Sequence, residues 1–244
     1  MPTQAEKAAK FVSLHEREGA FVIPNPWDLG SAQLFAGLGF EALATTSFGF
    51  AISLGRMDGD LTLDEKIDHC RALCERTALP VSADLENGFS DDPLKAAEAI
   101  RRGGEAGLVG GSIEDFCPDE GGRIYDFNHA VERVQAAVET SRTFGFPFLL
   151  TARAENLIRG VDDLDDTIRR LQAFEIAGAQ VVYAPGLKTL DEVRLVSESV
   201  NVPVNVLATP MRGFSVAEMA ANGAKRISIG GALTRAVASY IVSA

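Results

Sequence analysis

The chain has 244 residues, about the length of one α/β barrel, and its 46% hydrophobic and 23% charged residues are typical of a globular protein. The formal net charge is −11 and basic residues are not clustered, so we expect no nucleic-acid partner. No apolar stretch approaches the roughly 20 residues of a membrane span, and the N-terminus lacks the apolar core of a signal peptide. We therefore expect one domain, residues 1–244, in the cytoplasm and without membrane contact.

Short β-branched or apolar runs recur along the chain and alternate with amphipathic stretches of helical period. The expected strands are residues 20–23, 42–46, 81–84, 108–114, 148–153, 180–183, 204–207 and 226–229. The entries into strands two to eight alternate between a glycine and a proline, residues that end a preceding helix. Eight strands separated by helices predict an α/β fold, a parallel (β/α)8 TIM barrel, and we find no linker that would divide it.

One extra helix precedes the eight units, and the helix of the last unit is short. An N-terminal helix, residues 4–17, is expected to cover the barrel bottom, and residues 232–243 remain for the last helix. Cys70 and Cys74 lie four residues apart in a predicted helix and are expected in the core. With Cys117 they form an odd, sparse set, which fits a reducing compartment rather than a disulfide framework.

In such barrels the catalytic groups lie at the carboxyl ends of the strands. Asp84 ends strand three and Glu86 follows two residues later, so side-chain alternation predicts that both point into the barrel mouth. Glu114 and Arg153 end strands four and five, and strand seven offers Asn205. The sequence therefore predicts a cluster of carboxylates around one arginine.

Several carboxylates in one mouth need a compensating charge. Two of them about 5 Å apart repel by roughly 3 kcal/mol at an effective dielectric constant of 20. Oxygen ligands without His or Cys suit a hard ion, so the cluster predicts Mg²⁺, with Mn²⁺ as the alternative. A simple ion-pair network around Arg153 is the other interpretation, but one arginine cannot balance three carboxylates.

Other chemistries also have candidate residues. His15, His69 and His129 fall in predicted helices or at a helix start, where we expect structural roles and no zinc site. Lys188 could form the Schiff base of an aldolase, although it follows strand six on a loop. A degenerate barrel that only binds a ligand is a further alternative. The Gly230–Gly231 pair, which opens the last helix, could bind an anion through backbone N–H groups.

The motifs at the strand ends occur in one order along nearly the whole chain. They are Pro24-Asn25-Pro26-Trp27-Asp28, Thr45-Thr46-Ser47-Phe48-Gly49, Leu54-Gly55-Arg56-Met57-Asp58, Ser82-Ala83-Asp84-Leu85-Glu86-Asn87-Gly88, Ser112-Ile113-Glu114-Asp115 and Thr151-Ala152-Arg153. As a set they resemble the isocitrate lyase/phosphoenolpyruvate mutase superfamily. The resemblance implies a (β/α)8-barrel enzyme that carries out Mg²⁺-dependent enolate chemistry on a small carboxylic acid.

The resemblance also implies a metal-binding set. Asp84 would bind Mg²⁺ directly, and Glu86, Glu114 and Asp58 would hold it through water. Glu86 stands where many members have Asp, which lengthens one ligand. Residues 50–60 would form a mobile lid, and Asp58, which lies on it, is also a candidate catalytic residue.

A second implied set contacts the substrate. Ser47 and the backbone of Phe48 and Gly49 would bind the substrate carboxylate, and Asn205 is a further candidate contact. Arg153 would clamp the substrate and stabilise the developing enolate. Ser47 and Arg153 are therefore candidate catalytic residues as well as binding residues.

Two family motifs are missing. Lyases of the superfamily carry Lys-Lys/Arg-Cys-Gly-His after strand four, with Cys as the catalytic acid, whereas this chain reads Asp115-Phe116-Cys117-Pro118. The substrate-contacting His of the mutases after strand six is replaced by Tyr183-Ala184-Pro185. We therefore expect Mg²⁺-dependent carbon–carbon cleavage of a small 2-oxo acid through an enolate, with oxaloacetate-type decarboxylation first.

The alternatives are a phosphoenolpyruvate phosphonomutase or another carbon–phosphorus bond enzyme, such as a phosphonopyruvate hydrolase, and a methylisocitrate-type lyase. The expected partners are a small carboxylic-acid substrate and further copies of this chain, in a homodimer or homotetramer.

Overall fold

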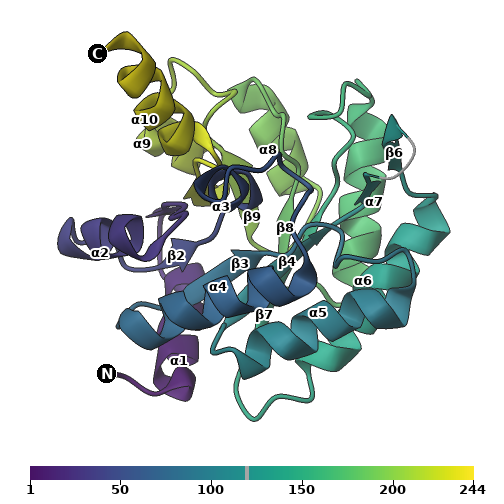
Figure 1. Ribbon diagram of the computed structural model, residues 1–244. Coiled ribbons are helices and arrows are strands. Elements are labelled where there is room, and N and C mark those ends of the chain that lie inside the picture. Colours follow the sequence, from purple (N-terminus) through teal and green to yellow (C-terminus); the bar gives the residue numbers. More distant parts are fainter. Residues whose placement is uncertain (119–120) are drawn as a thin grey trace.

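Eight parallel strands form the centre of the molecule and curve into a barrel (Figure 1). The structure is a computed structural model that describes residues 1–118 and 121–244. The barrel strands are β1 (Phe21–Ile23), β2 (Leu43–Ala44), β3 (Val81–Asp84), β4 (Gly110–Glu114), β7 (Leu149–Arg153), β8 (Val181–Tyr183), β9 (Val204–Leu207) and β10 (Ala224–Ser228). Their order is β1-β10-β9-β8-β7-β4-β3-β2. The predicted (β/α)8 fold is confirmed.

The barrel closes at a narrow seam between β1 and β2. There the backbone N–H of Ala44 donates to the carbonyl of Pro24 at 3.1 Å. The side chain of Asn25 reinforces the seam, because its Nδ2 donates to the Thr45 carbonyl at 3.3 Å. Its Oδ1 accepts from the backbone N–H groups of Ile229 and Gly230, both at 2.9 Å. One side chain thus connects strands from the two ends of the chain.

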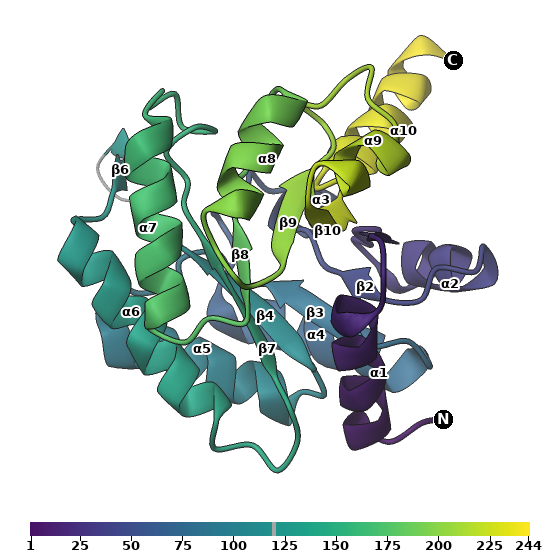
Figure 2. The same cartoon turned by 180° about the vertical axis from the view of Figure 1, so that it is seen from behind.

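Helices form the outer layer around the strands (Figure 2). They are α1 (Gln4–Glu16), α2 (Leu29–Gly37), α3 (Ser47–Ser53), α4 (Leu63–Arg76), α5 (Pro93–Glu105), α6 (Phe127–Ser141), α7 (Leu164–Ile176), α8 (Leu190–Glu198), α9 (Val216–Ala221) and α10 (Ala232–Ser243). The short helix α3 is an addition between β2 and α4. The expected first and last helices are confirmed as α1 and α10.

Helix α1 covers the amino-terminal end of the barrel. Phe11 and Leu14 of α1 are buried in one cluster with Phe21 and Val109. A Cβ on Gly110 would lie only 2.9 Å from the Phe11 ring, so glycine lets this ring enter the barrel bottom. Because this end is filled, a ligand must enter at the carboxyl ends of the strands.

The main hydrophobic core lies between the outer faces of the strands and the helices. Ile113 and Ala152 belong to it, together with Cys70 and Cys74, whose predicted core position is confirmed. The residues that alternate with them on the strands face the barrel interior instead, and many are polar. The barrel therefore has a polar interior inside an apolar shell.

Two features lie beside the barrel. After β4, β5 (Phe116–Cys117) and β6 (Arg123–Ile124) pair antiparallel. Helix α10 (Ala232–Ser243) carries five large apolar residues that are exposed, Leu233, Val237, Tyr240, Ile241 and Val242. Among the helices that the structure describes, none combines the length and apolarity that crossing a bilayer requires.

Candidate active site

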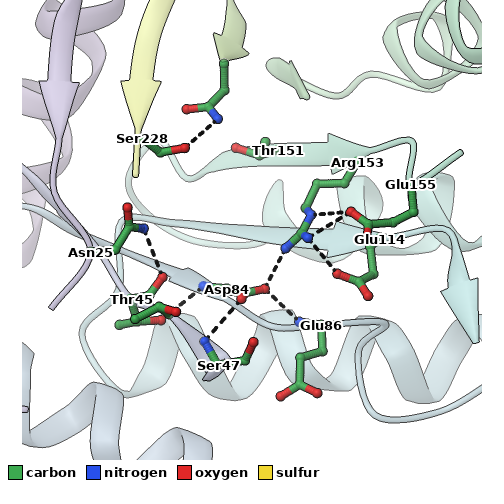
Figure 3. A network of polar contacts seen from close by, with 12 residues as sticks. Asn25, Thr45, Ser47, Asp84, Glu86, Glu114, Thr151, Arg153, Glu155 and Ser228 are labelled. Carbon is green, nitrogen blue, oxygen red and sulfur yellow. Dashed lines mark hydrogen bonds and ion pairs between the residues drawn. The ribbon is translucent and has the colours of Figure 1, made fainter. Parts of the chain in front are cut away.

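The centre of the candidate site is an ion pair between the ends of two strands. Asp84 is the last residue of β3, and Arg153 is the last residue of β7. Both strands pair with β4, which lies between them. Nη1 of Arg153 lies 2.8 Å from Oδ1 of Asp84 (Figure 3). Two residues that the sequence assigned to the barrel mouth are therefore in direct contact.

Arg153 binds two further carboxylates. Its Nη2 lies 3.0 Å from Oε2 of Glu114 and 2.8 Å from Oε1 of Glu155. Arg159 contacts the same two glutamates, at 3.3 Å from Glu114 and 3.2 Å from Glu155. Two arginines thus share three carboxylates, whereas the sequence argument counted one arginine. The second arginine further offsets the charge repulsion among these three groups.

Sequence reasoning missed Glu155 and Arg159. Both lie just beyond β7, in the type of loop that carries catalytic groups in such barrels. Their spacing of four residues is also that of an ion pair in a helical turn. Glu155 is only 1% exposed, and a glutamate is rarely so buried unless it is paired. The position after a strand end was the signal that could have identified them.

Burial and charge shift the ionisation of this cluster in opposite directions. Burial alone would raise the pKa of Asp84, but the charges of Arg153 and Lys66 outweigh it and lower that pKa. Burial raises the pKa of Glu114 well above its usual range, and Arg153 only partly opposes this. The surrounding carboxylates raise the pKa of Arg153 although its burial opposes them. Asp84 is therefore ionised at neutral pH and suits a cation.

The residues expected to bind a substrate carboxylate begin helix α3. The backbone N–H of Ser47 donates to Oδ2 of Asp84 at 3.2 Å, and Ser47 and Phe48 line the main cavity. Gly49 differs: it is absent from the described cavity walls, and its N–H donates to the Thr46 hydroxyl. A Cβ at this position would lie 2.7 Å from the side chains of Thr46 and Thr234. Gly49 thus allows close packing at this position.

The expected lid, residues 50–60, is only partly a loop. Its first four residues belong to α3, and the ring of Phe50 stacks on His69 with 3.9 Å between centroids. Residues 54–60 are exposed. Asp58, within this stretch, lines both cavities of the site. Desolvation and the charge of Asp84 raise the pKa of Asp58. The segment that could move is therefore shorter than expected.

Glu86 corrects the alternation argument. Strand β3 ends at Asp84, and Glu86 has a φ of +52°, in the left-handed region, so strand alternation does not extend to it. Its side chain points away from Arg153 (Figure 3). Within the described residues its Oε1 is buried without a hydrogen-bond partner. Burial raises the pKa of Glu86 to about 7. A cation beside Asp84 would satisfy this orphaned oxygen.

Two cavities meet at these residues. The main cavity, about 380 Å³, contains Asp84, and the second, about 300 Å³, is lined by Asp58, Glu86 and Glu114. Arg153 lines both. The four expected metal-binding carboxylates thus line two adjacent cavities, with Asp84 in the first and Glu86 and Glu114 in the second.

Within residues 1–118 and 121–244, no three Asp, Glu, His or Cys groups come close enough to hold a metal ion by themselves. Mg²⁺ needs no such group, because it usually keeps several waters and takes only one or two carboxylates. The carboxylate donor set and the orphaned Glu86 oxygen fit a hydrated ion that Asp84 binds directly.

Polar side chains form the floor of the main cavity. Asn205 donates to the Ser228 hydroxyl at 3.0 Å, and its Oδ1 accepts from Nε of Arg226 at 2.7 Å. Nη2 of Arg226 donates to the Thr151 hydroxyl at 3.0 Å. The expected contact Asn205 does line the cavity, and so does Arg226, which sequence reasoning missed. Its alternation with the core residue Ile227 was the available signal.

Other candidate groups lie outside the site. Cys117 is fully buried and donates to Asp91 at 3.3 Å, and it is absent from the described walls of the main and second cavities. Lys188 is exposed, which gives no support to a Schiff-base lysine. His15 and His69 lie in helices, and burial lowers the pKa of each to about 3, so they are neutral structural residues.

A parallel barrel with a carboxylate–arginine cluster at the carboxyl ends of its strands defines an enzyme of the α/β-barrel class. The family model of phosphoenolpyruvate phosphomutase matches residues 11–244. The chain belongs to this family, within the isocitrate lyase/phosphoenolpyruvate mutase superfamily, as its motifs indicated.

Three relatives illustrate the breadth of the family. A 2,3-dimethylmalate lyase from Eubacterium barkeri is 28% identical, over 84% of this chain and 72% of its own. An oxaloacetate decarboxylase from Paraburkholderia xenovorans is 27% identical, over 88% of this chain and 73% of its own. A crystal structure described as a lyase or mutase from Burkholderia cenocepacia J2315 has a TM-score of 0.96 and 52% identity, over 99% of this chain and 87% of its own.

Replacement of Asp84 tests the metal site. Asp84→Ala removes the carboxylate that Arg153 keeps ionised, so Mg²⁺ affinity measured by calorimetry is expected to fall at least about 100-fold. Asp191→Ala removes a carboxylate on α8 that is 81% exposed, and this control is expected to bind as the wild type does. Undiminished Mg²⁺ binding by Asp84→Ala would contradict the assignment.

The pH dependence of Mg²⁺ binding tests Glu86. A cation binds the ionised carboxylate, and with a pKa of about 7 Glu86 loses its charge as the pH falls through neutrality. The affinity is therefore expected to drop about tenfold from about pH 8 to about pH 6. Glu86→Gln lacks this titration and should show a smaller pH dependence in the same window. A flat wild-type profile would remove Glu86 from the metal site.

Proposed function

We propose that this protein is a Mg²⁺-dependent carbon–carbon lyase that cleaves a small 2-oxo acid through an enolate, with oxaloacetate-type decarboxylation as its reaction. The observation that carries this proposal is the Asp84–Arg153 pair, which holds an ionised carboxylate and a guanidinium side by side at one cavity. When bound, Mg²⁺ would act as a Lewis acid toward the oxo and carboxylate oxygens of the substrate. Asp84 would hold it directly.

Arg153 is suited to stabilise the enolate. Its three carboxylate contacts fix the guanidinium before substrate binds, and a group that is already oriented needs little reorganisation during the reaction. Its Nε and Nη2 donate to Glu155 and its Nη1 donates to Asp84, so among the contacts of the described residues the second N–H of Nη1 is unused. We infer that this N–H donates to the oxygen on which enolate charge develops.

Ser47 and Phe48 are suited to bind the C1 carboxylate. They begin α3 beside Asp84, and both line the cavity. Backbone N–H groups at the start of a helix favour a negative charge. The substrate would then lie with its carboxylate toward α3 and its oxo oxygen toward Arg153.

Decarboxylation demands little further from the site. The bond between C3 and the departing carboxylate breaks, and its electron pair forms the enolate. CO₂ leaves as a neutral molecule, and water can protonate the enolate carbon.

No positioned thiol acid is required for this reaction, which agrees with the burial of Cys117 against Asp91. The similarity to an oxaloacetate decarboxylase supports this reaction within the family. A screen of 2-oxo and 2-hydroxy acids with Mg²⁺, reading pyruvate and CO₂ separately, tests it directly.

Arg153→Lys tests the role of the guanidinium. Lysine keeps the positive charge but loses the planar fork that contacts three carboxylates and the substrate, so kcat is expected to fall at least about tenfold. Arg169→Lys makes the same exchange on α7, at a side chain that is 67% exposed, and should leave kcat unchanged. Equal kcat values for Arg153→Lys and the wild type would show that Arg153 is only a structural counter-ion.

Cys117→Ser tests the choice between decarboxylation and the thiol-dependent lyases. A serine hydroxyl can keep the hydrogen bond to Asp91, and we expect the variant to retain most of the activity. Mg²⁺ affinity, measured in parallel, controls for damage to the site. Loss of activity with intact Mg²⁺ binding would identify Cys117 as the catalytic acid, and a methylisocitrate-type lyase would then replace our proposal.

A further inference from the structure

Arg226 is a buried charge with an unusual set of partners. It lies on β10, is 5% exposed, and donates only to the neutral side chains of Asn205 and Thr151. Within the described residues its Nη1 is buried without any hydrogen-bond partner, and no carboxylate forms an ion pair with it. A buried charge is costly unless it is paired, so this arginine lacks a counter-ion.

The other buried arginines have compensation that Arg226 lacks. Arg153 contacts three carboxylates, and Arg170 pairs with Asp115 and Asp166. Arg133 donates to three backbone carbonyls and lies over the Tyr125 ring at 4.3 Å. Burial lowers the pKa of Arg226 to about 10, so it still carries its charge at neutral pH. Among the described residues, the charge of Arg226 is therefore buried without an ion pair.

This charge faces the main cavity. Arg226 lines the same 380 Å³ space as Asp84, Arg153 and Ser47. Ser228 and Asn205, which also line it, add a hydroxyl and an amide beside the guanidinium. Arg226 thus borders the space that a small anion would enter from the mouth.

The spacing suits a four-carbon diacid. Arg226 is bonded to Thr151, which lies two residues before Arg153 on β7 and faces the same interior. Side chains two residues apart on a strand are separated by about 6.6 Å. That is close to the length of a four-carbon dicarboxylate, so a diacid whose 2-oxo end lies at Arg153 would extend to the level of Thr151, which Arg226 contacts.

We propose that Arg226, with Ser228 and Asn205, forms a second anion subsite that binds the distal carboxylate of a four-carbon 2-oxo dicarboxylate. This inference rests on the proposed function, whose 2-oxo end lies at Arg153 and α3. Arg226 supplies the counter-charge for the dianion, and the neutral partners of the arginine leave its charge available for the ligand.

Arg226 acts on binding more than on the chemical step. As the carbon–carbon bond breaks, its electron pair moves toward the enolate, and the distal carboxylate becomes neutral CO₂. Arg226 therefore stabilises the bound substrate more than the transition state. Its removal is expected to raise KM while kcat stays unchanged or increases.

Binding of two matched probes tests the subsite. Lactate and malate share the same 2-hydroxy acid end, and only malate has a distal carboxylate. With Mg²⁺ present, the wild type is expected to bind malate at least about tenfold more tightly than lactate by calorimetry. Arg226→Met should remove this preference without changing lactate affinity. Arg194→Met, which removes an exposed, paired arginine on α8, controls for net charge and should keep the preference.

A second variant tests the subsite independently, in case Arg226→Met does not fold. Asn205→Asp is nearly isosteric, places a carboxylate 2.7 Å from Nε of Arg226, and can accept a hydrogen bond from Ser228 in place of the one that Asn205 donates. It neutralises Arg226 in place and should also remove the malate preference. A wild type that binds both probes equally, or a preference that survives in both variants, would overturn the subsite.

Kinetics separate this inference from the proposed function. With oxaloacetate, Arg226→Met is expected to raise KM at least about tenfold without lowering kcat. A fall in kcat at constant KM would overturn the binding role. Malate selectivity that depends on Arg226, in a wild type that does not decarboxylate oxaloacetate, would leave the subsite intact and reject the proposed reaction. Decarboxylation of oxaloacetate by a wild type that shows no malate preference would support the proposed reaction and reject the subsite.

Discussion

The arrangement of the site depends on one guanidinium held between carboxylates from different parts of the barrel. Arg153 on β7 binds Asp84 from β3, Glu114 from β4 and Glu155 from the loop after its own strand. In this way three segments that are distant in sequence are fixed relative to one another at the carboxyl end of the barrel. Since removing one partner of a buried pair leaves the other charge unpaired, the cluster is hard to alter one residue at a time.

The carboxylates of this site also differ in their pKa values. Asp84 is held ionised by Arg153 and Lys66, whereas burial raises the pKa of both Glu86 and Glu114. Carboxylates of one chemical type thus differ in how readily they lose a proton, and the difference comes from their surroundings rather than from their identity. A site of this kind can keep one carboxylate permanently ionised for a cation, while the protonation of the other two changes when a cation or substrate binds.

Much of the fold was accessible from the sequence because its signals are local. Strand runs, helix periodicity and the alternating glycine and proline entries predicted all eight barrel strands and both flanking helices. Asp84, Glu114 and Arg153 were found for the same reason, since each ends a strand. Glu86 does line the site, but strand alternation was the wrong reason, because a left-handed backbone at φ +52° interrupts it and no local pattern predicts that turn.

The remaining residues depend on tertiary contacts. Gly49 looked like part of a carboxylate-binding loop, but its role follows from its packing against Thr234, which is distant in sequence. Arg226 could not be recognised as an unpaired charge from the sequence, since that requires knowledge of every neighbour on the adjoining strands. Such properties become visible only when the whole barrel is assembled.

The hydrogen bonds that close the barrel between β1 and β2 affect when the site forms during folding. Asn25 accepts hydrogen bonds from Ile229 and Gly230, more than 200 residues later in the chain, and donates to Thr45 just before α3. Contacts of such long sequence separation form late, because the intervening chain must first be ordered. A nascent chain on the ribosome can thus fold many of its helices early. The hydrogen bonds of Asn25 to Ile229 and Gly230, however, cannot form until β10 has emerged. The catalytic cavity is therefore among the last parts of the molecule to acquire its shape during synthesis.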